Sequence, residues 1–148
     1  MRHQLKELLD RHIAELGEAK RAIHCEPELS LVNAIATLKS ANVGSLVVVE
    51  GTRVVGIFTE RDVLKKCALQ DIPINAKISD FMTRNPVCVQ RFETLGSVLN
   101  KMKAGKFRHI IITDSYGNLE KVVSQREILD YLLNYAISQE ETDLAKAG

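Results

Sequence analysis

The chain has 148 residues, of which 45% are hydrophobic, and its formal net charge is +1. This length predicts one domain, or two small ones that share a core. The balanced charge and an aromatic share of 5% argue against a long nucleic-acid surface. No stretch approaches the ~20 apolar residues of a membrane helix. The N-terminus has no apolar signal core and the three cysteines form no CxxC pair, so we expect a cytoplasmic protein.

The first predicted element is an amphipathic helix over residues 4–16, because leucine and isoleucine recur on one of its faces. Gly17 is its predicted stop. The apolar face could cover a second copy of the chain, or it could pack on the chain's own core. The sequence leaves both alternatives open.

The sequence then repeats one pattern. Residues 22–66 align with residues 86–130, so that Cys25 falls on Val89 and, after one extra residue in a turn, Thr59 falls on Ser124. Insertions are tolerated in such turns. The duplication predicts two similar units about a pseudo-twofold axis, and clefts between such units are natural ligand sites.

Each unit reads as strand, helix, strand, strand, helix. The strands are nearly continuous apolar runs, so we expect both of their faces to be buried. In chain order the predicted elements are a strand at 22–25, a helix from Leu31 to Asn42, two strands around the turn EGTR, a helix from Glu60, a strand at 86–90, a helix from Leu95 to Gly105, two strands around the turn DSYGN, and a helix at 125–138.

The fold class is therefore α/β (α+β), with two β-α-β-β-α repeats packed through their sheets and an extra N-terminal helix. We divide the chain into a helical extension, a first repeat, a linker, a second repeat and a polar tail that is expected to fray. The predicted boundaries are 1–20, 21–70, 71–85, 86–137 and 138–148.

The segment GIFTERD, residues 56–62, carries the main chemistry. A strand ends before Thr59, and the unpaired N–H groups of the following helix can hold a phosphate or a polar ligand edge. Asp62 lies one turn into that helix, where its carboxylate suits the two adjacent hydroxyls of a ribose. Gly56 would let a planar ring approach the backbone.

The same spacing also describes a helix cap. Thr59-x-x-Asp62 and Ser124-x-x-Glu127 both fit a capping box, which stabilises a helix by roughly 1 kcal/mol. Taken alone, these residues favour the cap over the ribose site.

Five motifs now stand together: NVGSLVVVE, VVGIFTERDVL, ISDFMTRNPVCV, KFRHIIITD and VVSQREIL. With them the chain resembles, over residues 22–135, a tandem pair of CBS domains, which is called a Bateman module. The resemblance implies an adenosyl ligand whose ribose is held by the hydroxyl and the carboxylate, with the adenine between apolar residues and the phosphates toward basic residues at the axis. Ligands in this family are AMP, ADP, ATP, S-adenosylmethionine, NAD and some cyclic dinucleotides.

The first repeat matches the family's nucleotide motif fully, whereas the second replaces the glycine by Lys121 and the aspartate by Glu127. The resemblance therefore implies one good site and one poor site. Arg108 and His109 lie where many members carry a basic pair, and Arg61 and Arg126 are further candidates, or plain surface charges. The predicted nucleotide-binding residues are Gly56, Ile57, Thr59, Arg61, Asp62, Arg108, His109, Ser124 and Glu127.

The resemblance implies a stand-alone regulatory module, commonly a homodimer, that binds AMP or ATP and modulates a separate partner. No nucleophile–base pair and no metal-ligand spacing among the four histidines is visible, so we expect no catalysis, no metal and no required cofactor. The main alternative is an interaction module without a ligand, in which the motif only caps a helix and side chains such as Phe58 or Lys121 fill the clefts. An enzyme with a hidden site is the third reading.

Overall fold

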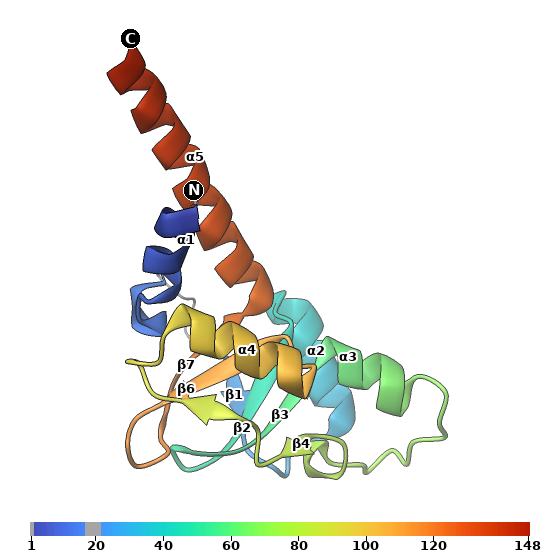
Figure 1. Ribbon diagram of the computed structural model, residues 1–148. Helices are drawn as coiled ribbons and strands as arrows, with labels where there is room; N and C mark the ends of the chain where they lie inside the picture. The colour runs from blue at the N-terminus through green and yellow to red at the C-terminus, as the bar shows by residue number, and fades with distance from the viewer. Residues whose placement is uncertain (1, 17–21) are drawn as a thin grey trace.

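The computed structural model describes residues 2–16 and 22–148 (Figure 1). The predicted stop at Gly17 lies outside these residues. In chain order the elements are α1 (Arg2–Leu9), the 3-10 turn η1 (Ile13–Glu15), β1 (His24–Cys25), α2 (Leu31–Ala41), β2 (Ser45–Glu50), β3 (Arg53–Thr59), α3 (Glu60–Asp62), the π-helical turn η2 (Val63–Cys67), the 3-10 turn η3 (Ile78–Asp80), β4 (Thr83–Arg84), β5 (Cys88–Val89), α4 (Leu95–Gly105), β6 (His109–Thr113), β7 (Leu119–Ser124) and α5 (Gln125–Ala147).

The strands form one sheet in each repeat, with the orders β1-β2-β3-β4 and β5-β6-β7. In each sheet the first strand is parallel to the second, and the second is antiparallel to the third. The register shifts between Val48 and Val49 in one sheet and between Ile112 and Thr113 in the other, at equivalent positions of the duplication. The predicted mixed α and β fold with two repeats is confirmed.

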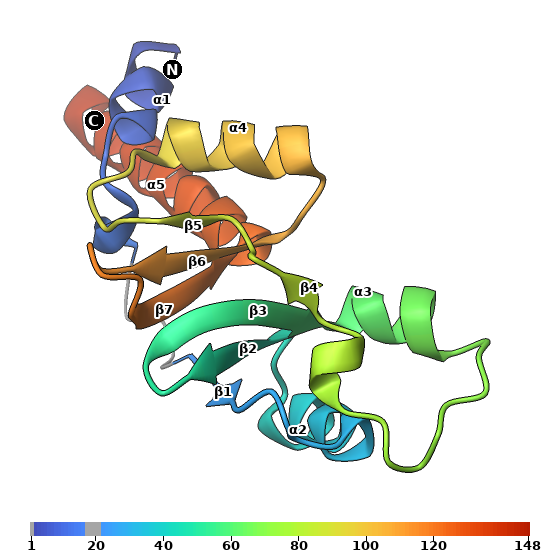
Figure 2. The same cartoon turned by 90° about the horizontal axis from the view of Figure 1, so that it is seen from below.

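Helices α2 and α4 lie on the outer sides of the two sheets (Figure 2). Each repeat has its own apolar core beneath its helices. A third apolar cluster lies between the repeats and contains Val47, Val49, Ile57 and Ile111. The strands therefore have apolar neighbours on both faces, as their continuous apolar runs predict.

Two short segments cross from one repeat to the other. Ile13 and Leu16 pack in the core of the second repeat, whereas Ile78 and Met82 pack in the core of the first. We call residues 12–16 and 77–82 the exchange segments. Each begins with one antiparallel bridge to the residue before a helix, from His12 to Thr94 and from Lys77 to Ser30. The duplication thus includes these segments, and the linker residues 77–82 are part of the first core.

The predicted helix over residues 4–16 is wrong in its second half, because α1 ends at Leu9. The backbone N–H of Ile13 donates to the carbonyl of Glu93 at 2.7 Å, and the helix would have to break for that contact to form. Leu8, Ile13 and Leu16 are all buried. The apolar stripe therefore packs largely on the chain's own core, which is the second of the two alternatives.

The predicted end of the last helix is also wrong. Helix α5 continues to Ala147, and its C-terminal part projects beyond the rest of the molecule (Figure 1). The segment 138–147 is rich in glutamate, alanine and lysine, which are good helix formers. The predicted frayed tail is therefore a continuation of α5.

Candidate nucleotide-binding cleft

A cleft of about 730 Å³ lies between the two repeats. Thr59 and Asp62 line it at the start of α3, and Arg108 and His109 line it at the start of β6. The equivalent backbone hydrogen bonds from Glu60 to the Gly44 carbonyl and from Gln125 to the Arg108 carbonyl fix the two helix starts against the two sheets. The cleft thus brings together residues that the sequence analysis assigned to the ribose and to the phosphates.

The start of α3 is a complete capping box. The hydroxyl of Thr59 accepts from the backbone N–H of Asp62 at 3.3 Å, and Oδ2 of Asp62 accepts from the backbone N–H of Thr59 at 3.0 Å. The Thr59 hydroxyl also donates to Oδ2 at 3.3 Å. The cap therefore forms, as one interpretation of the sequence predicts, while the same side chains remain on the wall of the cleft.

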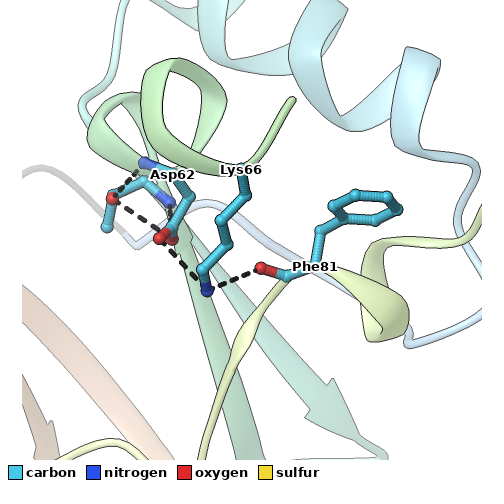
Figure 3. Close-up of polar contacts among 4 residues, drawn as sticks. Asp62, Lys66 and Phe81 are labelled. Atoms are coloured by element: carbon cyan, nitrogen blue, oxygen red, sulfur yellow. Dashed lines mark hydrogen bonds and ion pairs between the residues drawn. The ribbon is translucent and has the colours of Figure 1, made fainter. Parts of the chain in front are cut away.

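Lys66 is a contact of Asp62 that the sequence analysis missed. Its ammonium group lies 3.3 Å from Oδ1 of Asp62 and donates to the backbone carbonyl of Phe81 at 2.9 Å (Figure 3). The spacing of four residues on one helix is the signal that could have revealed it. Lys66 connects the carboxylate of the cleft to the exchange segment 77–82.

The structure gives Gly56 a different neighbour from the ligand ring that its sequence position suggested. A Cβ atom at Gly56 would collide with the sulfur of Met82. The glycine therefore makes room for a side chain of the exchange segment. Ile57, the next residue, does line the cleft.

The basic wall contains more cations than the predicted pair. Lys65, Lys106 and Arg126 also line the cleft, and Arg61 spans it, since its Nη1 donates to the carbonyl of Lys106 at 3.0 Å. Lys106 stands two residues before Arg108 in the motif KFRHIIITD, and the sequence analysis assigned it no role.

His109 is half-buried behind this wall, and a Cβ atom at Gly44 would lie 2.9 Å from its Nε2. Burial is the main cause that lowers the pKa of His109 below its usual 6.5, and the Arg108 charge acts in the same direction. Glu60 and Glu127 oppose these effects. The pKa of His109 therefore lies below its usual value, and a phosphate bound close to it would raise that pKa.

The second repeat forms the same cap with different residues. The hydroxyl of Ser124 accepts from the backbone N–H of Glu127 at 3.1 Å, and Oε1 of Glu127 accepts from the backbone N–H of Ser124 at 3.3 Å. Ser124 lines the cleft. The cleft wall that residues 83–87 give the first repeat corresponds to residues 18–23 for the second, and most of these lie outside the described part of the chain.

Neither Phe58 nor Lys121 fills the cleft. Phe58 is fully buried in the core of the first repeat, and Nζ of Lys121 donates to the carbonyl of Leu16 at 3.3 Å. Within residues 2–16 and 22–148, no three histidine, cysteine or carboxylate groups are placed to hold a metal. No helix in that same part of the chain is long and apolar enough to span a membrane.

The duplicated fold, with a cleft between its repeats, is that of a tandem pair of small mixed α and β domains. The model of the CBS domain family matches the chain twice, over residues 13–69 and 78–134. The chain therefore belongs to the CBS domain family and carries two of these domains in tandem. The two matches begin at Ile13 and Ile78, the equivalent first residues of η1 and η3.

Two curated relatives have no described function. One is an uncharacterized 17.7 kDa protein of Acidianus ambivalens, 34% identical over 110 residues that cover 74% of this chain and 66% of that protein. The other is the uncharacterized protein YlbB of Bacillus subtilis, 34% identical over 92 residues that cover 61% of this chain and 62% of that protein. The chain thus spans just under two thirds of the length of these relatives.

Solved structures share the fold. An uncharacterized conserved protein from Pyrococcus horikoshii matches with a TM-score of 0.75 and 27% identity, over 83% of this chain and 92% of that one. The CBS domain pair of protein MJ0100, solved with 5′-methylthioadenosine and S-adenosyl-L-methionine, matches with a TM-score of 0.69 and 26% identity, over 77% and 93%. A CBS domain protein from Pyrobaculum aerophilum complexed with AMP matches with a TM-score of 0.72 and, at 21% identity over 78% and 88%, shows the fold alone.

Proposed function

We propose that this chain is a regulatory module that binds an adenosyl nucleotide in the cleft between its repeats and thereby modulates a separate partner. The observation that carries the proposal is the arrangement of the cleft. A carboxylate and a hydroxyl at one helix start, Asp62 and Thr59, share the cleft with cationic side chains from both repeats. This is a ribose-type acceptor beside a phosphate-type donor set. The relative solved with two adenosyl compounds supports the adenosyl class.

The charge of the cleft favours AMP, ADP or ATP over S-adenosylmethionine. Two carboxylates, Glu60 and Asp62, stand against five cationic side chains: Arg61, Lys65, Lys106, Arg108 and Arg126. A positive cleft attracts a phosphate and repels the positively charged sulfonium of S-adenosylmethionine. Arginine also binds phosphate through two parallel hydrogen bonds. We therefore propose a phosphorylated nucleotide as the ligand, with no chemical step on it.

A ligand-free interaction module is the second candidate, because the complete capping boxes of α3 and α5 give Thr59, Asp62, Ser124 and Glu127 a structural role that needs no ligand. A thermal-shift panel separates the two candidates. AMP, ATP, adenosine, S-adenosylmethionine, 5′-methylthioadenosine and NAD would each be tested against the full chain. A ligand at 100 times its dissociation constant stabilises by about 2.7 kcal/mol, which corresponds to about 5–10 °C for a chain of this length. The proposal expects shifts with AMP or ATP, and no shift with any compound would favour the interaction module.

A further inference from the structure

Helix α5 carries an exposed apolar face with one charge toward each end. Spacings of three and four residues place six side chains on this side of the helix. In chain order they are Arg126, Leu129, Leu133, Ile137, Glu140 and Leu144. The four apolar members are between 43% and 68% exposed. An exposed apolar surface with a polar rim is typical of a contact surface for another molecule.

The opposite side of α5 is covered by the chain itself. Arg11, which follows α1, donates from Nη1 to the hydroxyl of Tyr131 at 2.8 Å, and its Cζ lies 5.3 Å from the centre of the Tyr135 ring. Figure 1 shows α1 beside this part of α5, whereas the C-terminal half of α5 projects beyond the molecule. Tyr131 lies about 200° around the helix from Leu129, so the contacts of Arg11 leave the apolar face open.

A groove of about 490 Å³ beside the first turns of α5 continues the apolar face. Its apolar lining includes Leu99 of α4 and Leu129 and Leu132 of α5, and Arg108 and Arg126 line it as well. Both arginines also line the nucleotide cleft. The apolar face of α5 therefore reaches the basic wall of the cleft.

The charges on this face determine the direction in which a second copy can pack. Arg126 and Glu140 are equally far from Leu133 along the helix, and so are Leu129 and Ile137. In an antiparallel pair centred on Leu133, each Arg126 therefore meets the Glu140 of the other copy. In a parallel pair, Arg126 would face Arg126 and Glu140 would face Glu140, and like charges oppose such packing.

We propose that α5 pairs in antiparallel orientation with α5 of a second copy, and that Glu140 of that copy binds Arg126 at the edge of the nucleotide cleft. The side chain of Arg126 is 78% exposed, and its pair with Asp130 engages Nε, 3.4 Å from Oδ1. Its outer nitrogens can thus bind a second carboxylate. Leu144 of the second copy then lies level with the groove between α4 and α5.

The second copy adds a carboxylate to the basic wall of the cleft. A bound phosphate would compete with this carboxylate for Arg126, because both are anions that bind the same guanidinium. The pairing of the helices does not depend on the proposed function, whereas the competition for Arg126 rests on it.

Charge reversal in the absence of nucleotide tests the pairing. Analytical ultracentrifugation measures the dissociation constant of the dimer for the full chain, for Arg126→Glu, for Glu140→Arg and for the double variant. Each single reversal turns both Arg126–Glu140 contacts of the symmetric pair into repulsions, so the constant should rise about tenfold. The double variant restores opposite charges, and its constant should return to within about threefold of the wild type.

Glu141→Arg is the matched control for the single reversals. It introduces the same charge one residue further along, about 100° around the helix from Glu140, and should change the constant less than about threefold. In a parallel pair, or in a dimer that does not use α5, both single reversals would leave the constant near the wild-type value. Either result would overturn the proposal, as would a double variant that does not recover or a wild type that is monomeric.

Glu140→Gln tests the competition for Arg126 by isothermal titration calorimetry. Without the carboxylate of the second copy, AMP should bind about threefold more tightly than it binds to the wild type. Adenosine has no phosphate and should bind equally to both proteins. Equal AMP affinities would overturn the competition. Failure of the wild type to bind AMP would refute the proposed function, and the ultracentrifugation result would still decide the pairing.

Discussion

Replacing Asp62 by alanine separates the role of this residue in the ligand site from its role as a helix cap. The variant loses the cap at Thr59, worth about 1 kcal/mol, and the partly exposed contact with Lys66, worth at most about 1 kcal/mol. We therefore expect the free energy of unfolding to fall by about 1–2 kcal/mol. Most of the protein should still be folded at 25 °C, since domains are stable by about 5–15 kcal/mol.

The same variant should lose about 1.5–3 kcal/mol of binding energy for AMP, or about 10- to 150-fold in affinity, because a hydrogen bond to a charged acceptor is lost. Electrostatics alone predicts the opposite sign, since the variant removes a negative charge from a cleft that is to hold a phosphate. Calorimetry measures the affinity, and urea denaturation measures the stability.

Asp80→Ala is the matched control for this experiment. Its Oδ2 accepts from the backbone N–H of Lys77 at 3.3 Å, so it also caps a short helix through a carboxylate. Asp80 does not line the cleft. The control should lose stability without losing affinity for AMP. If folded Asp62→Ala binds AMP as tightly as the wild type does, Asp62 only caps the helix and the reasoning about the ribose is refuted.

Three further predictions concern the rest of the cleft and the assembly. Arg108→Ala should weaken AMP and ATP binding much more than adenosine binding, and equal losses would remove Arg108 from the phosphate site. The free energy of unfolding should fall as the pH drops below about 6.5. Burial lowers the pKa of His109, so in this pH range the unfolded chain binds a proton that the folded chain does not. The difference in the free energy of unfolding between pH 7.5 and pH 5.5, measured by denaturation, should be smaller in His109→Gln than in the wild type. The chain should be a homodimer by light scattering, and the exposed apolar side chains of Leu129, Leu133 and Ile137 on α5 are the surface that a second copy would cover. Aspartate at Leu133 should then yield a monomer, whereas a wild-type monomer at micromolar concentration would contradict the assembly.

Much of the fold could be predicted because its signals are local. Apolar runs mark the buried strands. Helix ends are marked by residue types that tolerate a left-handed backbone, such as Asn42, which ends α2 with φ of 52°. The break of the first helix after Leu9 could not be predicted in this way. Its cause is a hydrogen bond between Ile13 and Glu93, which are distant in the sequence. Whether these two residues meet depends on how the exchange segment 12–16 packs on the second repeat.

The residues of the candidate site also fall into two groups, those with a local sequence signal and those without one. Thr59, Asp62, Arg108 and His109 come from short motifs, and the structure places all four around one cleft. Residues 83–87, where the linker meets the second repeat, form a cleft wall that depends on the pairing of β4 with β3, and the sequence analysis did not predict it. A connecting segment carries no local pattern that distinguishes a wall from a loop.

The glycine of the nucleotide motif gains a new interpretation from these contacts. In the first repeat, Gly56 leaves the space that Met82 of the exchange segment fills. At the equivalent positions of the second repeat the sequence has Lys121 and Gly17, so the large and the small residue have changed places. Such a volume-conserving exchange is tolerated far better than the loss of a glycine alone. Lys121 then has a structural task at the Leu16 carbonyl, and a difference in nucleotide affinity between the repeats should follow from the carboxylates of Asp62 and Glu127 rather than from the missing glycine.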